Sequence, residues 1–183
     1  MSAGDEHTLR LADRTEVVVR PIEPDDAPLL QAFVRRLSPR SRRFRFFVAL
    51  AELSDAQLHR FVNMEPARGV ALIALAHGRD GAAIVGEARY ALEQDHDHAE
   101  FAVVVADDFQ RRGLGRHLLK RLMTTAWRRG VRRLFGEIRN DNRAMLAFAM
   151  HLGFRLRGSL DDESVVLANM LRSTERVGST GMS

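Results

Sequence analysis

Short runs of apolar and β-branched residues alternate along this chain with turns rich in glycine, aspartate and asparagine. Runs of this length and composition, bounded by turn residues, are typical of strands. Gly78 and Gly81 lie between two such runs and predict a hairpin turn. The expected strands cover residues 16–22, 70–76, 82–93, 99–106, 131–139, 154–157 and 164–170.

Longer segments with apolar residues at helical spacing fall between these strands. The clearest one repeats an apolar residue every four positions, at Leu114, Leu118, Leu122 and Ala126, and Gly130 ends it. The expected helices cover residues 27–37, 56–63, 112–129 and 143–152. The order β-α-α-β-β-β-α-β-α-β-β follows. It predicts an α/β fold with a mixed sheet and helices on both of its faces.

Arginine and phenylalanine alternate in residues 40–47, after a helix break at Ser38-Pro39. Two interpretations remain open for this segment. It forms either a basic lip of a binding site with aromatic anchors, or a helical turn that packs its phenylalanines on the core and leaves its arginines in solvent.

Composition places the chain among globular proteins with one domain. It has 183 residues, 45% of them hydrophobic, and its longest apolar run, residues 70–76, is too short to span a bilayer. We expect the domain to cover residues 15–172, between a flexible leader at 1–14 and a flexible tail at 173–183. The chain has no cysteine, which excludes disulfides and thiol nucleophiles and fits a cytoplasmic location.

The charge distribution argues against nucleic acid as a partner. The pI is 10.7 but the net charge is only +4, because Lys120 is the single lysine among 28 basic residues and arginine does not titrate near neutral pH. Acidic residues are interspersed among the basic ones. A second polar segment, Asp95-His96-Asp97-His98, alternates two metal-binding residue types, but turns are commonly rich in aspartate. We therefore expect no metal, no nucleic acid and no membrane partner.

The segment from Glu100 to Lys120 carries the most informative pattern. A β-branched run leads into a turn and then into a helical segment that opens with Gly113 and Gly115. Glycines let backbone N–H groups approach a ligand, and the N-terminus of a helix carries partial positive charge. This order of strand, glycine turn and helix predicts a site for a phosphate-bearing cofactor.

The residues Gln110-Arg111-Arg112-Gly113-Leu114-Gly115 match the pattern Q/R-x-x-G-x-G/A of the GNAT superfamily of N-acetyltransferases. Residues 142–154 are similar to a second segment of that superfamily, N-x-x-A…x-G-F, and the resemblance covers residues 16–170. It implies the GNAT fold, with a mixed and mostly antiparallel sheet, and acetyl-CoA as co-substrate. The implied cofactor-binding residues are Val103, Val104, Val105, Gln110, Arg111, Arg112, Gly113, Leu114, Gly115, Arg116 and Asn142.

A narrower resemblance links residues 20–26, 37–47 and 100–103 to the acetyltransferase domain of bacterial protein lysine acetyltransferases. It implies a protein partner with an acceptor lysine, such as an acyl-CoA synthetase. Two alternatives remain open. The acceptor is a small amine or a protein N-terminus, or the chain binds acyl-CoA without turnover. We expect a monomer or a homodimer, and the loop at 161–163 is a candidate for the acceptor side.

Acetyl transfer to lysine needs a base, since an amine with a pKa near 10.4 is almost entirely protonated at neutral pH. The resemblance assigns this role to Glu100, about 17 Å along an extended strand from Val105 at ~3.3 Å per residue. The alternative is a glutamate in a surface ion pair. Many members of the superfamily have a tyrosine acid where this chain has Ala149, so we assign no general acid. His117 and His151 are expected to be bystanders.

Overall fold

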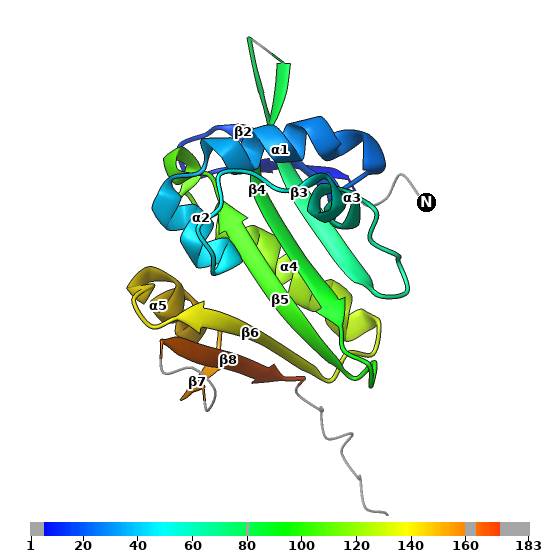
Figure 1. Cartoon of the computed structure of the whole chain (residues 1–183), viewed down its shortest axis with the longest axis vertical. Coiled ribbons are helices and arrows are strands. Elements are labelled where there is room, and N and C mark those ends of the chain that lie inside the picture. Colours follow the sequence, from blue (N-terminus) through cyan, green and yellow to red (C-terminus); the bar gives the residue numbers. More distant parts are fainter. Residues whose placement is uncertain (1–5, 80, 160–163, 173–183) are drawn as a thin grey trace, which may run out of the picture.

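The computed structural model of this chain describes residues 6–79, 81–159 and 164–172. Within them, the strands form one sheet in the order β1-β2-β3-β4-β5-β6-β8-β7 (Figure 1). Neighbouring strands are antiparallel except β5 and β6, which are parallel. The strands are β1 (His7–Arg10), β2 (Glu16–Pro21), β3 (Gly69–Gly78), β4 (Gly81–Leu92), β5 (His98–Val105), β6 (Arg133–Arg139), β7 (Arg155–Gly158) and β8 (Val165–Leu171).

Helices cover both faces of this sheet, as the sequence predicts. One face carries α1 (Ala27–Arg36), α2 (Pro39–Phe46) and α3 (Asp55–Val62), and the other carries α4 (Leu114–Arg128) and α5 (Arg143–His151) (Figure 1). The predicted apolar stripe of α4 is buried from Leu114 to Ala126. No helix in the described ranges is both long and apolar enough to cross a membrane.

The alternation of side chains along the central strands gives the molecule two cores. On β3, Leu72 and Ala74 pack into the core under α4 and α5, while Ile73 and Leu75 pack into the core under α1 and α3. Successive strand residues point to opposite faces, so a strand buried on both sides reads as a continuous apolar run. This is why residues 70–76 contain no polar side chain.

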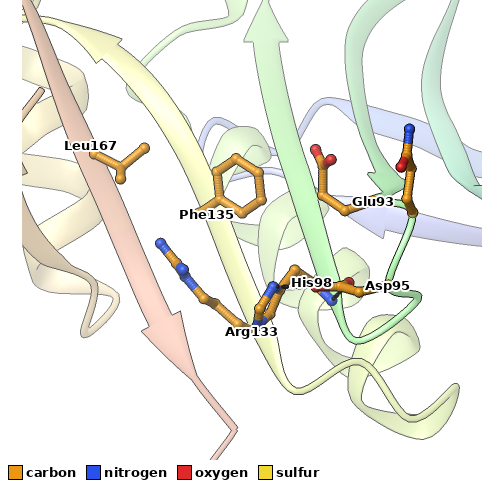
Figure 2. A pocket seen from close by; sticks show the side chains of 7 residues that line it. Glu93, Asp95, His98, Arg133, Phe135 and Leu167 are labelled. Carbon is orange, nitrogen blue, oxygen red and sulfur yellow. Dashed lines mark hydrogen bonds and ion pairs between the residues drawn. The ribbon is translucent and has the colours of Figure 1, made fainter. Parts of the chain in front are cut away.

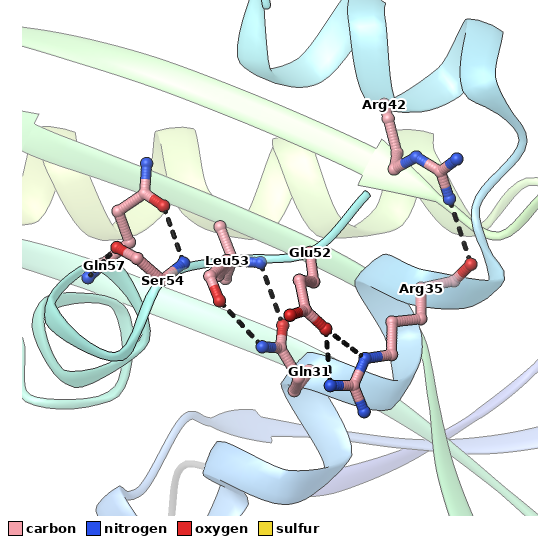
Figure 3. A network of polar contacts seen from close by, with 7 residues as sticks. All are labelled: Gln31, Arg35, Arg42, Glu52, Leu53, Ser54 and Gln57. Atoms are coloured by element: carbon pink, nitrogen blue, oxygen red, sulfur yellow. Dashed lines mark hydrogen bonds and ion pairs between the residues drawn. The ribbon is translucent and has the colours of Figure 1, made fainter. Parts of the chain in front are cut away.

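Helix α2 is tied to the turn after β5 at its start, and the segment that follows it is tied to α1. At its start, Asp107 accepts hydrogen bonds from the Ser38 N–H at 2.9 Å and from the hydroxyls of Ser38 and Ser41 at 2.7 Å each. The chain that follows α2 is tied to α1, where the Gln31 amide exchanges two hydrogen bonds with the backbone of Leu53 at 2.8 and 3.0 Å (Figure 3). Residues 40–47, which the pattern left open, are therefore a fixed helical element.

The N-terminal segment differs from the expected flexible leader. His7–Arg10 forms β1, which pairs with β2 in a register that places His7 opposite Val19. The sequence pattern did not predict this strand because four residues are too few to show alternation, and its side chains are mostly polar. The expected tail at 173–183 lies outside the described residues, as does the loop at 161–163.

A histidine pair attaches β1 to α4 and makes this contact sensitive to pH. The Nε2 atoms of His7 and His117 are 2.6 Å apart, and Arg121 contacts the other nitrogen of His7. Burial, together with the charge of Arg121, lowers the pKa of both imidazoles below 6.5. The unfolded chain therefore binds more protons than the folded chain just below pH 6.5, and folded stability present above that pH is lost as the pH falls.

We expect the melting temperature to fall between pH 7 and pH 5, and to fall less in His117→Gln, which removes one of the two coupled protonations. Calorimetry at the two pH values measures the difference. The control is His59→Gln, because His59 is exposed on α3. An equal fall in wild type and His117→Gln would contradict this account of the pair.

Candidate active site

A cleft of about 650 Å³ opens where β5 and β6 separate, between α2 on one side and the starts of α4 and α5 on the other. Figure 1 shows the two strands diverging beneath α2. The cleft brings together most of the residues singled out in the sequence, which come from four separate elements. Its walls include Glu100, Val103, Val104, Val105, Gln110, Arg111, Gly113, Gly115, Arg116 and Asn142.

The opening leaves backbone groups of β5 without a neighbouring strand. In the described residues, β5 and β6 pair only as far as Glu100 opposite Phe135. At one end of β5, the His98 carbonyl accepts a hydrogen bond from the N–H of Glu93, just after β4. Beyond the other end, the Ala106 N–H donates to the Val85 carbonyl of β4, so the even-numbered residues face β4. Backbone groups alternate in direction along a strand, so those of Val103 and Val105 face the opening. An extended ligand with amide groups can therefore pair along this edge as an added strand does.

The turn after β5 is shaped for an anion. Arg111 and Gly113 both have positive φ, at 60° and 92°, and Gly113 caps the N-terminus of α4. Backbone turned in this way points successive N–H groups toward one point, and the helix N-terminus adds partial positive charge. The Gln110 amide closes the turn by donating to the Val105 carbonyl at 3.2 Å. A Cβ at Gly115 would sit 3.5 Å from Val105, an ordinary contact.

Two residues of the predicted cofactor set lie outside the cleft wall. The Arg112 side chain forms an ion pair with Asp13 and lies over the ring of Phe109 at 4.9 Å. Leu114 is buried in the core under α4. Of these two residues, only the backbone N–H groups remain as candidate contacts to a ligand at the turn. Near the turn, the positive side chains that line the cleft are instead Arg111 and Arg116.

Glu100 stands where the opening between β5 and β6 begins. Its side chain is exposed to solvent, but the protein atoms around the carboxyl partly desolvate it and raise its pKa above the ordinary 4.5. The charges of Glu137 and Glu93 raise the pKa further, against an opposing effect of Arg45. A carboxylate with a raised pKa is a stronger base, and the ideal pKa of a general base lies near the working pH. The geometry and the pKa direction both suit proton removal at this point.

A second hollow, of about 410 Å³, lies on the same face of the sheet beside Glu100. Phe135, the register partner of Glu100, forms part of its wall, and Figure 2 shows Glu93 and Phe135 on opposite sides of β5. The turn at 95–98 closes one end, where the Asp95 carboxylate contacts the His98 imidazole at 2.7 Å. No set of three or more metal-binding side chains occurs in the described part of the chain.

The candidate proton donors lie in different places. Tyr90 is fully buried in the core, as is Ala149, which stands where many members of the superfamily have a tyrosine, and His117 is paired with His7. His151 lines the cleft from α5. No acid is assigned.

Several residues of the cleft were not predicted as site residues, among them Phe44 and Arg45 of α2 and Glu137 of β6. The alternating segment at 40–47 was the one available signal for the first two. Glu137 follows a glycine in an otherwise ordinary strand pattern and carried no signal.

The Acetyltransferase (GNAT) family matches residues 33–154, the part of the chain that runs from α1 through the cleft elements to α5. The chain belongs to the GNAT family of acetyltransferases. It is an acyltransferase enzyme of the class that moves an acetyl group from acetyl-CoA to an amine.

The similarity to individual GNAT proteins extends over nearly the whole chain. An acetyltransferase of Pseudomonas aeruginosa is 34% identical over 164 residues, which cover 90% of this chain and 88% of that protein. The crystal structure of the GNAT domain of S. lividans PAT superposes with a TM-score of 0.84 at 29% identity, over 94% of this chain and 99% of that one.

A third relative matches only part of the chain. The ribosomal protein bS18-alanine N-acetyltransferase of Salmonella typhimurium is 48% identical over 54 residues, 30% of this chain and 36% of that protein.

Proposed function

We propose that this GNAT enzyme acetylates lysine side chains of a protein in the cytoplasm, with Glu100 as the general base. The observation that carries the proposal is the position of Glu100 at the start of the opening between β5 and β6, with a pKa above its ordinary value. The resemblance of residues 20–26 and 37–47 to protein lysine acetyltransferases supports lysine as the acceptor.

The cleft suits the proposed co-substrate, acetyl-CoA. The diphosphate would be held by N–H groups of the turn from Arg111 to Gly113 and of the first turn of α4, with Arg116 adding charge. The backbone of Val103 and Val105 would pair with the pantetheine amides, and Asn142 also lines this cleft. When bound, acetyl-CoA supplies an acetyl group activated as a thioester.

Glu100 would remove a proton from the acceptor ammonium, directly or through a water molecule. The N–H of Val103 faces the opening and would donate to the oxyanion that forms during transfer. The departing thiolate has an ordinary pKa near 8.5, so the reaction near neutral pH does not require a strong general acid. This agrees with the position of Tyr90, the one tyrosine of the chain, which is buried and does not line the cleft.

The acceptor side of the site favours a positively charged group. Glu93 and Glu137 are close enough to Glu100 to raise its pKa, so three carboxylates face this region from consecutive parts of the sheet. Phe135 adds an aromatic surface in the hollow beside them, where the Arg133 guanidinium already lies over its ring at 5.4 Å. A lysine side chain combines an apolar stem with a terminal cation and therefore suits such a surface.

A protein N-terminus is the second candidate acceptor. The partial match to the ribosomal protein bS18-alanine N-acetyltransferase favours this acceptor. A protein α-amine is also cationic when protonated, so it suits the same acidic surface. The two acceptors differ in the chain around the amine, since a lysine reaches the cleft on a long flexible stem.

Incubation of the enzyme with isotope-labelled acetyl-CoA and a cell lysate would identify the acceptor. We expect label in protein, and peptide mass spectrometry should place it on lysine side chains. Parallel incubations with a panel of free amines should show little label, and Glu100→Gln serves as the catalytic control. Label confined to protein N-termini or to small amines would replace lysine with that acceptor. Absence of label in every arm, with acetyl-CoA still bound, would favour a module without turnover.

A further inference from the structure

Three charged side chains are buried together next to the cleft. Glu87 of β4 is 2% exposed, and its two carboxylate oxygens contact two arginines, Arg89 at 2.5 Å and Arg45 of α2 at 3.3 Å. The side chains of both arginines are 10% exposed. Burial opposes the ionisation of Glu87, but the two arginines outweigh it and lower the pKa of this carboxyl. The group is therefore an ionised triad with one excess positive charge.

Aromatic residues hold this triad in place. The Arg89 guanidinium lies 3.8 Å from the centre of the Phe61 ring, and Arg45 lies over the rings of Phe46 and Phe61 at 5.0 and 5.5 Å. Stacked, ion-paired guanidinium groups have little freedom to turn. Arg45 therefore presents its charge from a fixed place, although it sits on a short helix.

Arg45 is the member of the triad that brings positive charge to the cleft. Arg45 and Glu100 both line the cleft, and Glu87 does not. The Nε of Arg45 is buried and has no hydrogen-bond acceptor among the described residues, and Glu87 is the one carboxylate paired with Arg45 there. One carboxylate faces two guanidinium groups, so the triad keeps one positive charge, and Arg45 is its member that lines the cleft.

The surroundings of Glu100 give this charge a role. Ala91 of β4 lies directly opposite Glu100 and is uncharged, and His98, two residues away on β5, is paired with Asp95. The charged groups that act on Glu100 are Glu93 after β4, Glu137 on β6 and Arg45 on α2. Burial and the two glutamates favour the protonated form of Glu100, whereas Arg45 favours the ionised form.

We propose that Arg45 is a positioning residue that, clamped by Glu87, holds a positive charge near Glu100 and favours the ionised form of this carboxylate without forming an ion pair with it. A direct ion pair would occupy the carboxylate oxygens that must accept the acceptor's proton. Glu87 therefore acts as a tether that retains Arg45 in the wall. The catalytic meaning of this arrangement rests on the proposed role of Glu100, but the electrostatic arrangement can be tested without turnover.

The test is an NMR titration of the glutamate carboxyl groups in the full chain, with Glu100 assigned by the signal missing from Glu100→Gln. Arg45→Met removes the charge, keeps an apolar stem against Phe46 and Phe61, and leaves Glu87 paired one to one with Arg89. We expect the pKa of Glu100 to rise by about half a unit or more. Arg45→Gln should give the same rise and serves if the methionine variant does not fold.

Two further variants distinguish position from charge alone. Arg43→Gln removes an arginine from the same helix, but Arg43 pairs with Asp141 and does not line the cleft, so the pKa of Glu100 should stay unchanged. Glu87→Gln keeps the charge of Arg45 but removes the tether that retains it in the wall, so the pKa of Glu100 should rise, by less than in Arg45→Met.

The outcomes separate this inference from the proposed function. An unchanged pKa of Glu100 in both Arg45 variants, or an equal rise in Arg43→Gln, would overturn the role of Arg45. A rise confined to the Arg45 variants supports it even if Glu100→Gln keeps full activity, a result that would overturn only the proposed base. If Glu100 is the base, the rise of kcat/KM with pH should shift to higher pH in the Arg45 variants, by the same amount as the pKa of Glu100.

Discussion

Glu100→Gln should lower the rate of acetyl transfer by about 10²–10⁴-fold, the range that general base catalysis commonly contributes. The amide has nearly the shape of the carboxylate but cannot accept the proton that the acceptor ammonium must lose. Acetyl-CoA binding should change by less than about twofold, because the turn that would hold the diphosphate lies at the other end of β5.

Single-turnover rates and calorimetric titration with acetyl-CoA measure these two quantities separately. Glu65→Gln is the matched control, since it makes the same change at an exposed carboxylate that pairs with Arg68 and lines neither hollow, and it should keep the full rate. In the wild type, kcat/KM should rise with pH through the raised pKa of Glu100, since the base works only when ionised. A fully active Glu100→Gln enzyme would remove Glu100 from the mechanism.

Gly113→Ala should weaken acetyl-CoA binding by about tenfold or more, as expected for the loss of a charge-assisted hydrogen bond. Gly113 has φ of 92°, which a residue with a Cβ adopts only at a cost of about 1–2 kcal/mol. Relief of this strain would turn the N–H groups at the start of α4 away from the diphosphate.

Gly130→Ala provides the control because Gly130 has nearly the same backbone conformation, with φ of 90°. A Cβ meets no atom within 4 Å at either glycine, and Gly130 follows the opposite end of α4. Both variants should lose similar stability in thermal melts, but only Gly113→Ala should lose the rise in melting temperature caused by acetyl-CoA. An equal loss of this rise in both variants would place the diphosphate elsewhere.

The elements around the cleft show how far local pattern predicts structure. The apolar stripe of α4 and the long central strands were visible because each spans several periods of its own repeat. The four residues of β1 span two periods of a strand at most, so this strand depends on its pairing with β2. For α2 the pattern left two interpretations open, and the structure combines them. Phe46 packs against the core, whereas Phe44 and Arg45 line the cleft.

The proposed cofactor side and the proposed base were predicted from the sequence for different reasons. The turn around Gly113 is a local motif of six residues, so its spacing carries the information. Glu100 is a single glutamate in a strand, and only a family resemblance distinguished it. Arg112 looked like a phosphate ligand by its place in the motif, yet its side chain pairs with Asp13, a contact across 99 positions of the chain.

By itself, the sequence determined the secondary structure of most of the chain, the α/β class and the glycine turn after β5, because periodicity, capping and glycine placement act between near neighbours. Only the tertiary structure decided where β5 and β6 part, which charges surround Glu100, and that Arg45 reaches Glu87 from another element. These features depend on distances between residues far apart in the chain. A carboxylate's pKa is set by burial and by neighbouring charges, and neither can be read from its own position in a strand.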